Sequence, residues 1–237
     1  MVTKDTTHSL CIILGMHKSG TSFLVSSLFN SGFSVGHDVS EIGYQKDLKG
    51  ESRELRDINN EILGTAGLHS TSIIRKRDYP NSTTLIHQFL SKQESTHLAL
   101  KDPRLVLTYQ DHWKSILPEH KIIITFRNPF YVIRHYASHF NSKTKWRVLF
   151  RSLRAWRAYN KELLQIIESA KEETFITEFE TILTSEEERK HFSQFVGINI
   201  SFFEESKTQK KVQRWKLFAG QVLGFPIYQE LKSKGRS

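Results

Sequence analysis

The sequence Leu10-Cys-Ile-Ile-Leu-Gly-Met-His-Lys-Ser-Gly-Thr-Ser22 decides the predicted fold of this chain. Its first five residues form an uninterrupted apolar run, which is typical of a strand buried on both faces of a parallel sheet. Gly15 ends the run, a short polar segment follows, and residues 23–30 have the pattern of a helix. A strand, a tight polar loop and a helix N-terminus together predict an anion site, because backbone N–H groups and the helix dipole favour negative charge there.

The loop between Gly15 and Gly20 is close to the nucleotide-binding loop G-x-x-x-x-G-K-[ST] but differs from it in the place of its lysine. Thr21 stands where that loop has lysine, and Lys18 precedes Gly20 by two residues. An ordinary turn with a helix cap is the alternative interpretation, since Gly, Ser and Thr also favour turns and caps. The preceding strand and the following helix favour the anion site.

The order Gly-Met-His-Lys-Ser-Gly-Thr-Ser from Gly15 to Ser22 resembles the sulfate-binding loop of sulfotransferases that use 3′-phosphoadenosine-5′-phosphosulfate (PAPS). The resemblance implies one P-loop-like domain over residues 1–237, a three-layer α/β/α fold with a central parallel sheet. It also implies that Lys18 is catalytic at the leaving oxygen, with PAP as the nucleotide product. The residues implied to bind the 5′-phosphosulfate are His17, Lys18, Ser19, Gly20, Thr21 and Ser22.

Further apolar runs separated by helical patterns complete the predicted α/β fold. Together with 10–14, the predicted parallel strands are 98–101, 121–126 and 174–177, and 33–35 is a short extended piece. Residues 31–50 and 64–83 are expected to be mainly loop, with the acceptor pocket in the 31–83 region. The other expected helices are 51–63, 84–93, 109–117, 129–140, 146–167, 185–197 and 228–232.

Arg127 follows the predicted strand 121–126 directly and precedes Asn128-Pro129. Asn suits an N-cap and Pro the first helical position, so a helix is expected to begin here. In the sulfotransferases that the chain resembles, such an arginine grips the 3′-phosphate of the nucleotide, and a serine eight residues later adds a contact. Here His135 occupies the eighth position and Ser138 lies one turn beyond it, so either is an expected donor.

The segment K-G-E-S-R-E-L-R-D-I-N-N-E-I-L resembles a bacterial sulfotransferase segment that supplies a glutamate, which makes Glu51 the predicted catalytic base. This chain lacks the two residues that usually separate the glycine from the glutamate. A second tract, L-K-D-P-R from Leu100 to Arg104, also resembles these enzymes. The alternative candidates for the base are His37, Asp38 and Asp102.

The longest periodic segment, 146–167, contains A-W-R-A-Y-N-K-E-L-L, which resembles the W-x-x-Y-N-x-x-L-L helix of the same family. Its aromatic residues are expected in the core. Arg147, Arg151 and Arg154 line another face, which is expected to be solvated, with a wall for an anionic acceptor as the alternative. The basic stretch 207–216 is either a mobile segment or a flap over the nucleotide.

Composition limits the class of protein. The 237 residues are 38% hydrophobic and 25% charged, which fits one large globular domain. A single cysteine, Cys11, excludes a disulfide framework and a cysteine metal site, and no metal is expected. Without an apolar run of about 18 residues or a signal core, the expected location is cytoplasmic.

The net charge of +9 favours anionic partners. PAPS and an unidentified acceptor hydroxyl or amine, with a carbohydrate as one candidate, are the expected partners, and nucleic acid is not expected because no nucleic-acid-binding motif is present. Two other functions stay open. A P-loop kinase or NTPase would need lysine at position 21, where the chain has Thr21. A non-catalytic polyanion binder is suggested by net charge alone.

Overall fold

The computed structural model describes residues 9–36, 50–65, 79–137, 145–202 and 226–235. Its sheet contains β1 (Ser9–Leu14), β2 (His97–Lys101), β3 (Lys121–Phe126) and β4 (Thr174–Glu178). All pairings are parallel and the strand order is β2-β1-β3-β4. The predicted parallel strands are confirmed, each to within one residue at either end. β1 and β3 are the buried apolar runs that are typical of central parallel strands, and β2 and β4 lie at the edges of the described sheet.

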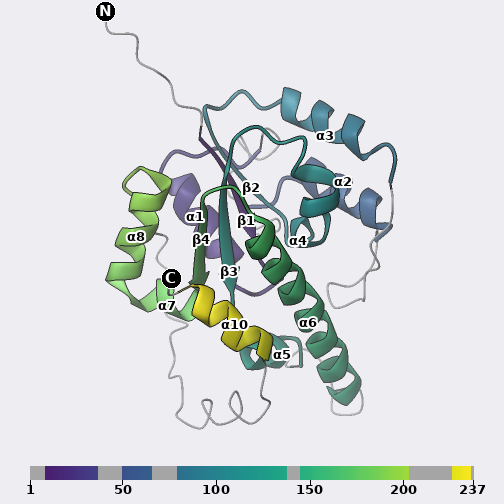
Figure 1. The fold of residues 1–237 in the computed structure, drawn as a ribbon, viewed down its shortest axis with the longest axis vertical. Coiled ribbons are helices and arrows are strands. Elements are labelled where there is room, and N and C mark those ends of the chain that lie inside the picture. Colours follow the sequence, from purple (N-terminus) through teal and green to yellow (C-terminus); the bar gives the residue numbers. More distant parts are fainter. Residues whose placement is uncertain (1–8, 37–49, 66–78, 138–144, 203–225, 236–237) are drawn as a thin grey trace, which may run out of the picture.

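Helices cover both faces of the sheet, so the three-layer α/β/α prediction is also confirmed (Figure 1). One face packs against α1 (Thr21–Asn30), α7 (Phe179–Thr184) and α8 (Glu186–Val196). The other face packs against a larger set of helices, which are α2 (Arg53–Leu63), α3 (Ser82–Ser91), α4 (Leu105–Thr108), the π-helical turn η1 (Tyr109–Trp113), α5 (Pro129–Ala137), α6 (Lys145–Ser169) and α10 (Pro226–Lys234).

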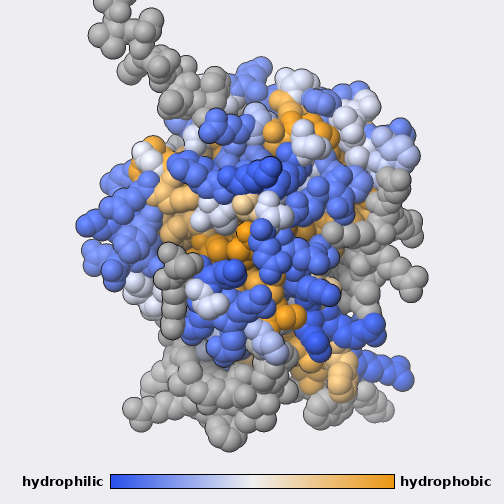
Figure 2. Space-filling model, viewed as in Figure 1, coloured by the Kyte–Doolittle hydropathy of each residue, from blue (hydrophilic) through white to orange (hydrophobic). Residues whose placement is uncertain are grey.

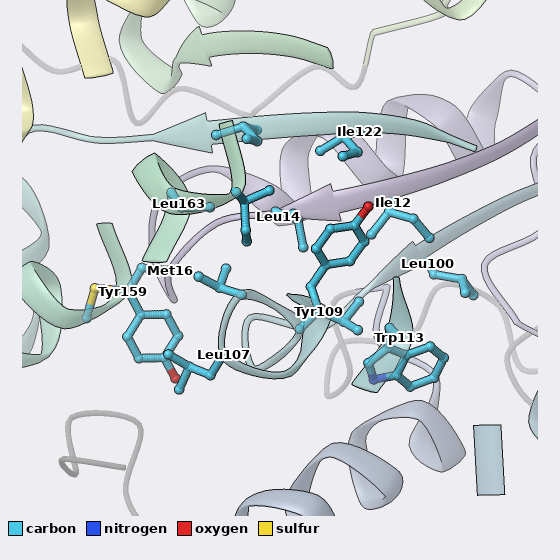
Figure 3. Packing of buried hydrophobic residues seen from close by; sticks show 14 of the residues in the cluster. Ile12, Leu14, Met16, Leu100, Leu107, Tyr109, Trp113, Ile122, Tyr159 and Leu163 are labelled. Carbon is cyan, nitrogen blue, oxygen red and sulfur yellow. The ribbon is translucent and has the colours of Figure 1, made fainter. Parts of the chain in front are cut away.

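The alternation of side chains along β1 divides the core into two parts. Ile12 and Leu14 point to the larger cluster, where Figure 3 shows them with Met16 beside side chains from β2, α4, η1 and α6. Cys11 and Ile13 point to the other cluster, under α1 and α8. Cys11 is buried, and burial raises the pKa of its thiol to about 11.

Several predicted helix starts are wrong by two residues or more: α1, α3 and α10 each begin two residues before the expected position. The helix expected from Glu51 begins at Arg53, because Ser52 is its N-cap and accepts a hydrogen bond from the Leu55 N–H at 3.2 Å. The helix expected over 109–117 starts earlier, at Leu105, and becomes a π-helical turn from Tyr109. That turn lets Trp113 donate a hydrogen bond to the buried Asn59 of α2 at 3.1 Å.

The helix starts expected at Pro129 and Ser185 agree with the structure to within one residue. Asn128 caps α5, since its side-chain oxygen accepts from the Phe130 N–H at 3.0 Å. Ser185 caps α8 in the same way, and Gly197 ends it with φ +90°. Ser34, in the expected extended piece, forms a bridge with Leu98 of β2. No helix in the described part of the chain has the length and apolar character needed to cross a membrane.

Candidate functional site

The two strands that follow β1 in the sequence lie on opposite sides of it, so β1 is the point where the strand order of the sheet reverses. From β1 the chain passes to β2 on one side, and then crosses to β3 on the other side. In open α/β sheets, ligands bind at the carboxyl ends of the strands where the order reverses. The predicted anion loop follows β1 and Arg127 follows β3, so both lie at this switch point.

The loop has the tight backbone that its two glycines predict. A Cβ atom added to Gly15 would lie 2.5 Å from the Thr125 carbonyl oxygen, so the backbone passes too close to β3 for any side chain there. Lys18 has φ +70°, in the left-handed region that costs a residue with a side chain about 1–2 kcal/mol. Strain of this kind concentrates at functional sites, where the surrounding structure holds it in place.

Ser19 shapes this loop through both of its donors. Its backbone N–H and its hydroxyl donate to the Met16 carbonyl, at 3.1 and 2.6 Å, and its own carbonyl accepts from the Thr125 hydroxyl at 2.9 Å. The Ser19 side chain is therefore turned inward and is 2% exposed. Its structural role is to fix the turn, and its expected contact with an anion stays a prediction.

Gly20 is the N-cap of α1 and leaves the start of that helix without a side-chain cap. It has φ +96°, and a Cβ there would lie 2.1 Å from the Phe179 ring, so glycine is required on both counts. Since no side chain caps this helix start, the positive end of the helix dipole suits an anion there. Thr21 and Ser22 begin the helix, with the Thr21 side chain buried against Gly15.

Arg127 lies beside the loop and is held by α7. Its Nη1 donates to the Lys18 carbonyl at 3.4 Å, and its Nε pairs with Glu180 Oε1 at 2.6 Å. The guanidinium carbon lies 4.8 Å from the centre of the Phe179 ring and 5.1 Å from that of Tyr131, which sets the plane of the group. Burial raises the pKa of Glu180, and the nearby Arg127 opposes that shift.

Glu51 lies at the same edge of the sheet, on the β2 side of the loop. Its Oε1 pairs with Nζ of Lys101 at 2.5 Å, and the same Nζ lies 3.5 Å from the Ser22 hydroxyl in the first turn of α1. The Lys101 side chain is 2% exposed and that of Glu51 is 18% exposed. The structure thus brings the predicted base next to the predicted anion loop, through a lysine that the sequence reasoning did not select.

Asp102 has the environment of a structural residue. It is fully buried, and its carboxylate accepts from the Arg104 N–H at 2.7 Å and from Arg104 Nη1 at 3.1 and 3.2 Å. Burial raises the pKa of Asp102, while the Arg104 guanidinium opposes the rise. These bonds fix the turn after β2, and the alternative role of Asp102 as a base stays a prediction.

The two candidate histidines that the structure describes occupy different places. His17, in the loop, lies edge-on to Tyr159 of α6, with ring centres 6.3 Å apart. His135 is half-buried on α5 and lies edge-on to Tyr136 at 5.9 Å. His37, Asp38, Ser138 and the 207–216 segment lie outside the described residues. The roles expected for these groups stay predictions.

Sequence reasoning missed Lys101 and Glu180. Lys101 stands in the quoted L-K-D-P-R tract at the end of a predicted strand, and Glu180 stands in the E-F-E-T-I-L segment after β4. Their positions at carboxyl ends of parallel strands were the available signal. Which residue each one pairs with depends on contacts between segments about 50 residues apart, and a single sequence does not contain that information.

The structure defines an α/β protein with the predicted anion loop at the switch point of a parallel sheet. No family model and no curated protein matches the chain. Among solved structures, it is similar to the sulfotransferase domain of the Synechococcus PCC 7002 olefin synthase, with 18% identity over 97% of this chain and 87% of that domain, and a TM-score of 0.46. A similarity this weak establishes neither a shared family nor a shared activity.

Proposed function

We propose that the protein is a sulfotransferase that moves a sulfuryl group from PAPS to a hydroxyl or amine of an acceptor, with carbohydrates as the first acceptor class to test. The observation that carries the proposal is the meeting of the G-M-H-K-S-G-T-S loop and Arg127 at the switch point, joined by the contact of Arg127 Nη1 with the Lys18 carbonyl. One nucleotide with a 5′ and a 3′ anionic group can reach both.

The residues present suit an anionic donor. The uncapped start of α1 offers backbone N–H groups and a positive dipole end to a 5′-phosphosulfate. Lys18 would neutralise the charge that develops on the leaving oxygen. Arg127 would bind the 3′-phosphate as a planar, multi-donor cation, on a guanidinium already oriented by Phe179 and Tyr131.

PAPS supplies a sulfuryl group whose S–O bond to the 5′-phosphate breaks as a new bond to the acceptor oxygen or nitrogen forms. The acceptor loses one proton in this exchange, and Glu51 is the proposed recipient. Lys101 holds Glu51 by Oε1, so Oε2 is the oxygen assigned to take the proton. Lys101 is thus a positioning residue, and the ion pair fixes the carboxylate beside the loop.

The test is to incubate the purified protein with labelled PAPS and a panel of carbohydrate, phenol and amine acceptors. We expect labelled product with at least one acceptor. Lys18→Ala should lower kcat by about 10²–10³, as for other single electrostatic donors, and Glu51→Gln by about 10²–10⁴, as for a general base. Lys190→Ala removes an exposed lysine from α8 and is the matched control.

Both site variants should keep the circular dichroism spectrum and melting profile of the wild type, so that lost turnover reports on chemistry. Unchanged turnover in folded Lys18→Ala would contradict the role given to the loop. Transfer from ATP in place of PAPS would contradict the sulfotransferase assignment and favour a kinase.

A further inference from the structure

One exposed face of α6 carries an unusual concentration of positive charge. We call it the basic face and define it by Arg147, Arg151, Arg154, Arg157 and Lys161, all of which are exposed. Their spacing of three or four residues places them along one side of the helix. The face spans 14 residue steps, or about 21 Å at 1.5 Å per residue.

Repulsion between the charges of the basic face destabilises α6. Residues 145–161 contain no Asp or Glu, so each neighbouring pair on the basic face is a like-charge pair. Such pairs are destabilising at spacings of three or four residues. The first turn of α6 also has no acidic residue, although a helix N-terminus favours negative charge. Within the described part of the chain, none of the five side chains takes part in an ion pair or hydrogen bond.

An apolar side chain stands among these cations. Phe150 is 64% exposed, well above the other large apolar residues that the structure describes, and it lies beside Arg147, Arg151 and Arg154 on the helix surface. Leu149 and Leu153 are half-buried in the same two turns. Figure 1 shows that this N-terminal half of α6 extends past α5 and α10 at the margin of the molecule. Over the same part of α6, Figure 2 shows a hydrophobic patch bordered by hydrophilic side chains.

We propose that the basic face docks the protein on an anionic membrane surface, with the cations at phospholipid headgroups and Phe150 inserted at their boundary with the acyl chains. Clusters of four to eight Lys and Arg residues on a helix are suited to anionic lipids. Phe150 selects the bilayer over a soluble polyanion, because a sulfated polysaccharide or a nucleic acid duplex offers the charge without an apolar phase.

This docking is independent of the activity proposed above, and it needs no membrane-spanning helix. Each Lys or Arg near an anionic bilayer contributes about 1 kcal/mol, so removing three should weaken the partition coefficient by about 10²-fold. The attraction is electrostatic over a Debye length of about 10 Å at 0.1 M salt and about 3 Å at 1 M.

The test is co-sedimentation of the full chain with vesicles of 70% phosphatidylcholine and 30% phosphatidylserine, and with vesicles of phosphatidylcholine alone. We expect binding to the anionic vesicles at 0.1 M salt and its loss at 1 M. The triple variant Arg151→Ala, Arg154→Ala, Arg157→Ala should bind about 10²-fold more weakly, and Phe150→Ser several-fold more weakly. All of these changes are at exposed helix positions, so folding should be retained.

The matched control is Lys171→Ala, Lys190→Ala, Lys234→Ala, which removes three charges from exposed positions outside the basic face. Its vesicle binding should stay within a few-fold of the wild type. Equal loss in the two triple variants would show that net charge alone attracts the protein, and would overturn the proposal. So would an unchanged Phe150→Ser variant, or binding of the wild type to heparin or duplex DNA with none to anionic vesicles.

Discussion

At the scale of single residues, Arg127 and Glu180 form an ion pair at the place proposed for the 3′-phosphate. Glu180 is held by α7 against the guanidinium, with Oε1 at 2.6 Å from Nε, while its Oε2 is buried with no hydrogen-bond partner in the described structure. Burial is the larger influence on this carboxyl and raises its pKa above the ordinary value. The folded protein therefore binds a proton at Glu180 more tightly than the unfolded chain does.

A stability difference with pH follows from this shift. A raised folded pKa contributes stability that is complete below the unfolded pKa and is lost as the pH rises through the folded pKa. Glu180→Gln resembles the protonated carboxyl at every pH, so its free energy of unfolding should increase relative to the wild type between about pH 4 and pH 7. Urea unfolding across this range measures the difference. A relative decrease with pH would mean that the Arg127 pair outweighs burial.

At the scale of elements, the strands and the long helix could be predicted from sequence because their patterns are strong. β1 and β3 contain continuous apolar runs, and α6 repeats its apolar residues over about six turns. The start of α2 was misplaced, because a serine cap one residue after Glu51 overrode the helical appearance of Glu51 itself. The π-helical turn at Tyr109 was missed, since it is set by tertiary contacts of Tyr109 and Trp113 with His120 and Asn59.

The basic face of α6 predicts an unusual effect of charge reversal on stability. Arg154→Glu replaces repulsion with attraction toward Arg151 and Arg157, which lie three residues away on either side. We expect the free energy of unfolding to increase by about 0.5–1 kcal/mol at low salt, with less gain at 1 M salt. Thermal melts at the two salt concentrations test this. Arg154→Gln should give about half of the increase, and a lower melting temperature in Arg154→Glu would contradict the self-repulsion described for this face.

At the scale of the whole molecule, the position of the site follows from the strand order. A loop after β1 and an arginine after β3 come together because β1 and β3 are parallel neighbours at the switch point. The sequence could predict both residues as strand-end groups, and the parallel sheet then required them to share an edge. It could not predict that Glu51 would pair with Lys101 at the end of β2, because this pairing depends on the path of the chain between the two residues.

The proposal that Arg127 binds the 3′-phosphate is tested by calorimetry, which compares the binding of adenosine 3′,5′-bisphosphate with that of adenosine 5′-phosphate. The wild type should bind the bisphosphate more tightly. Arg127→Ala should weaken the bisphosphate by about 1.5–3 kcal/mol, or about 10- to 150-fold, and leave the monophosphate nearly unchanged. His135→Ala should also weaken the bisphosphate more than the monophosphate, but by a smaller factor than Arg127→Ala. If the imidazolium is the donor, this loss of affinity should be larger at low pH.

Arg134→Ala is the matched control, since it removes an exposed arginine from the neighbouring helix α5 and should leave both affinities unchanged. Of these two arginine variants, only Arg127→Ala should lose affinity for the bisphosphate while keeping its affinity for the monophosphate. Equal weakening of both nucleotides by Arg127→Ala, or no preference of the wild type for the bisphosphate, would contradict it.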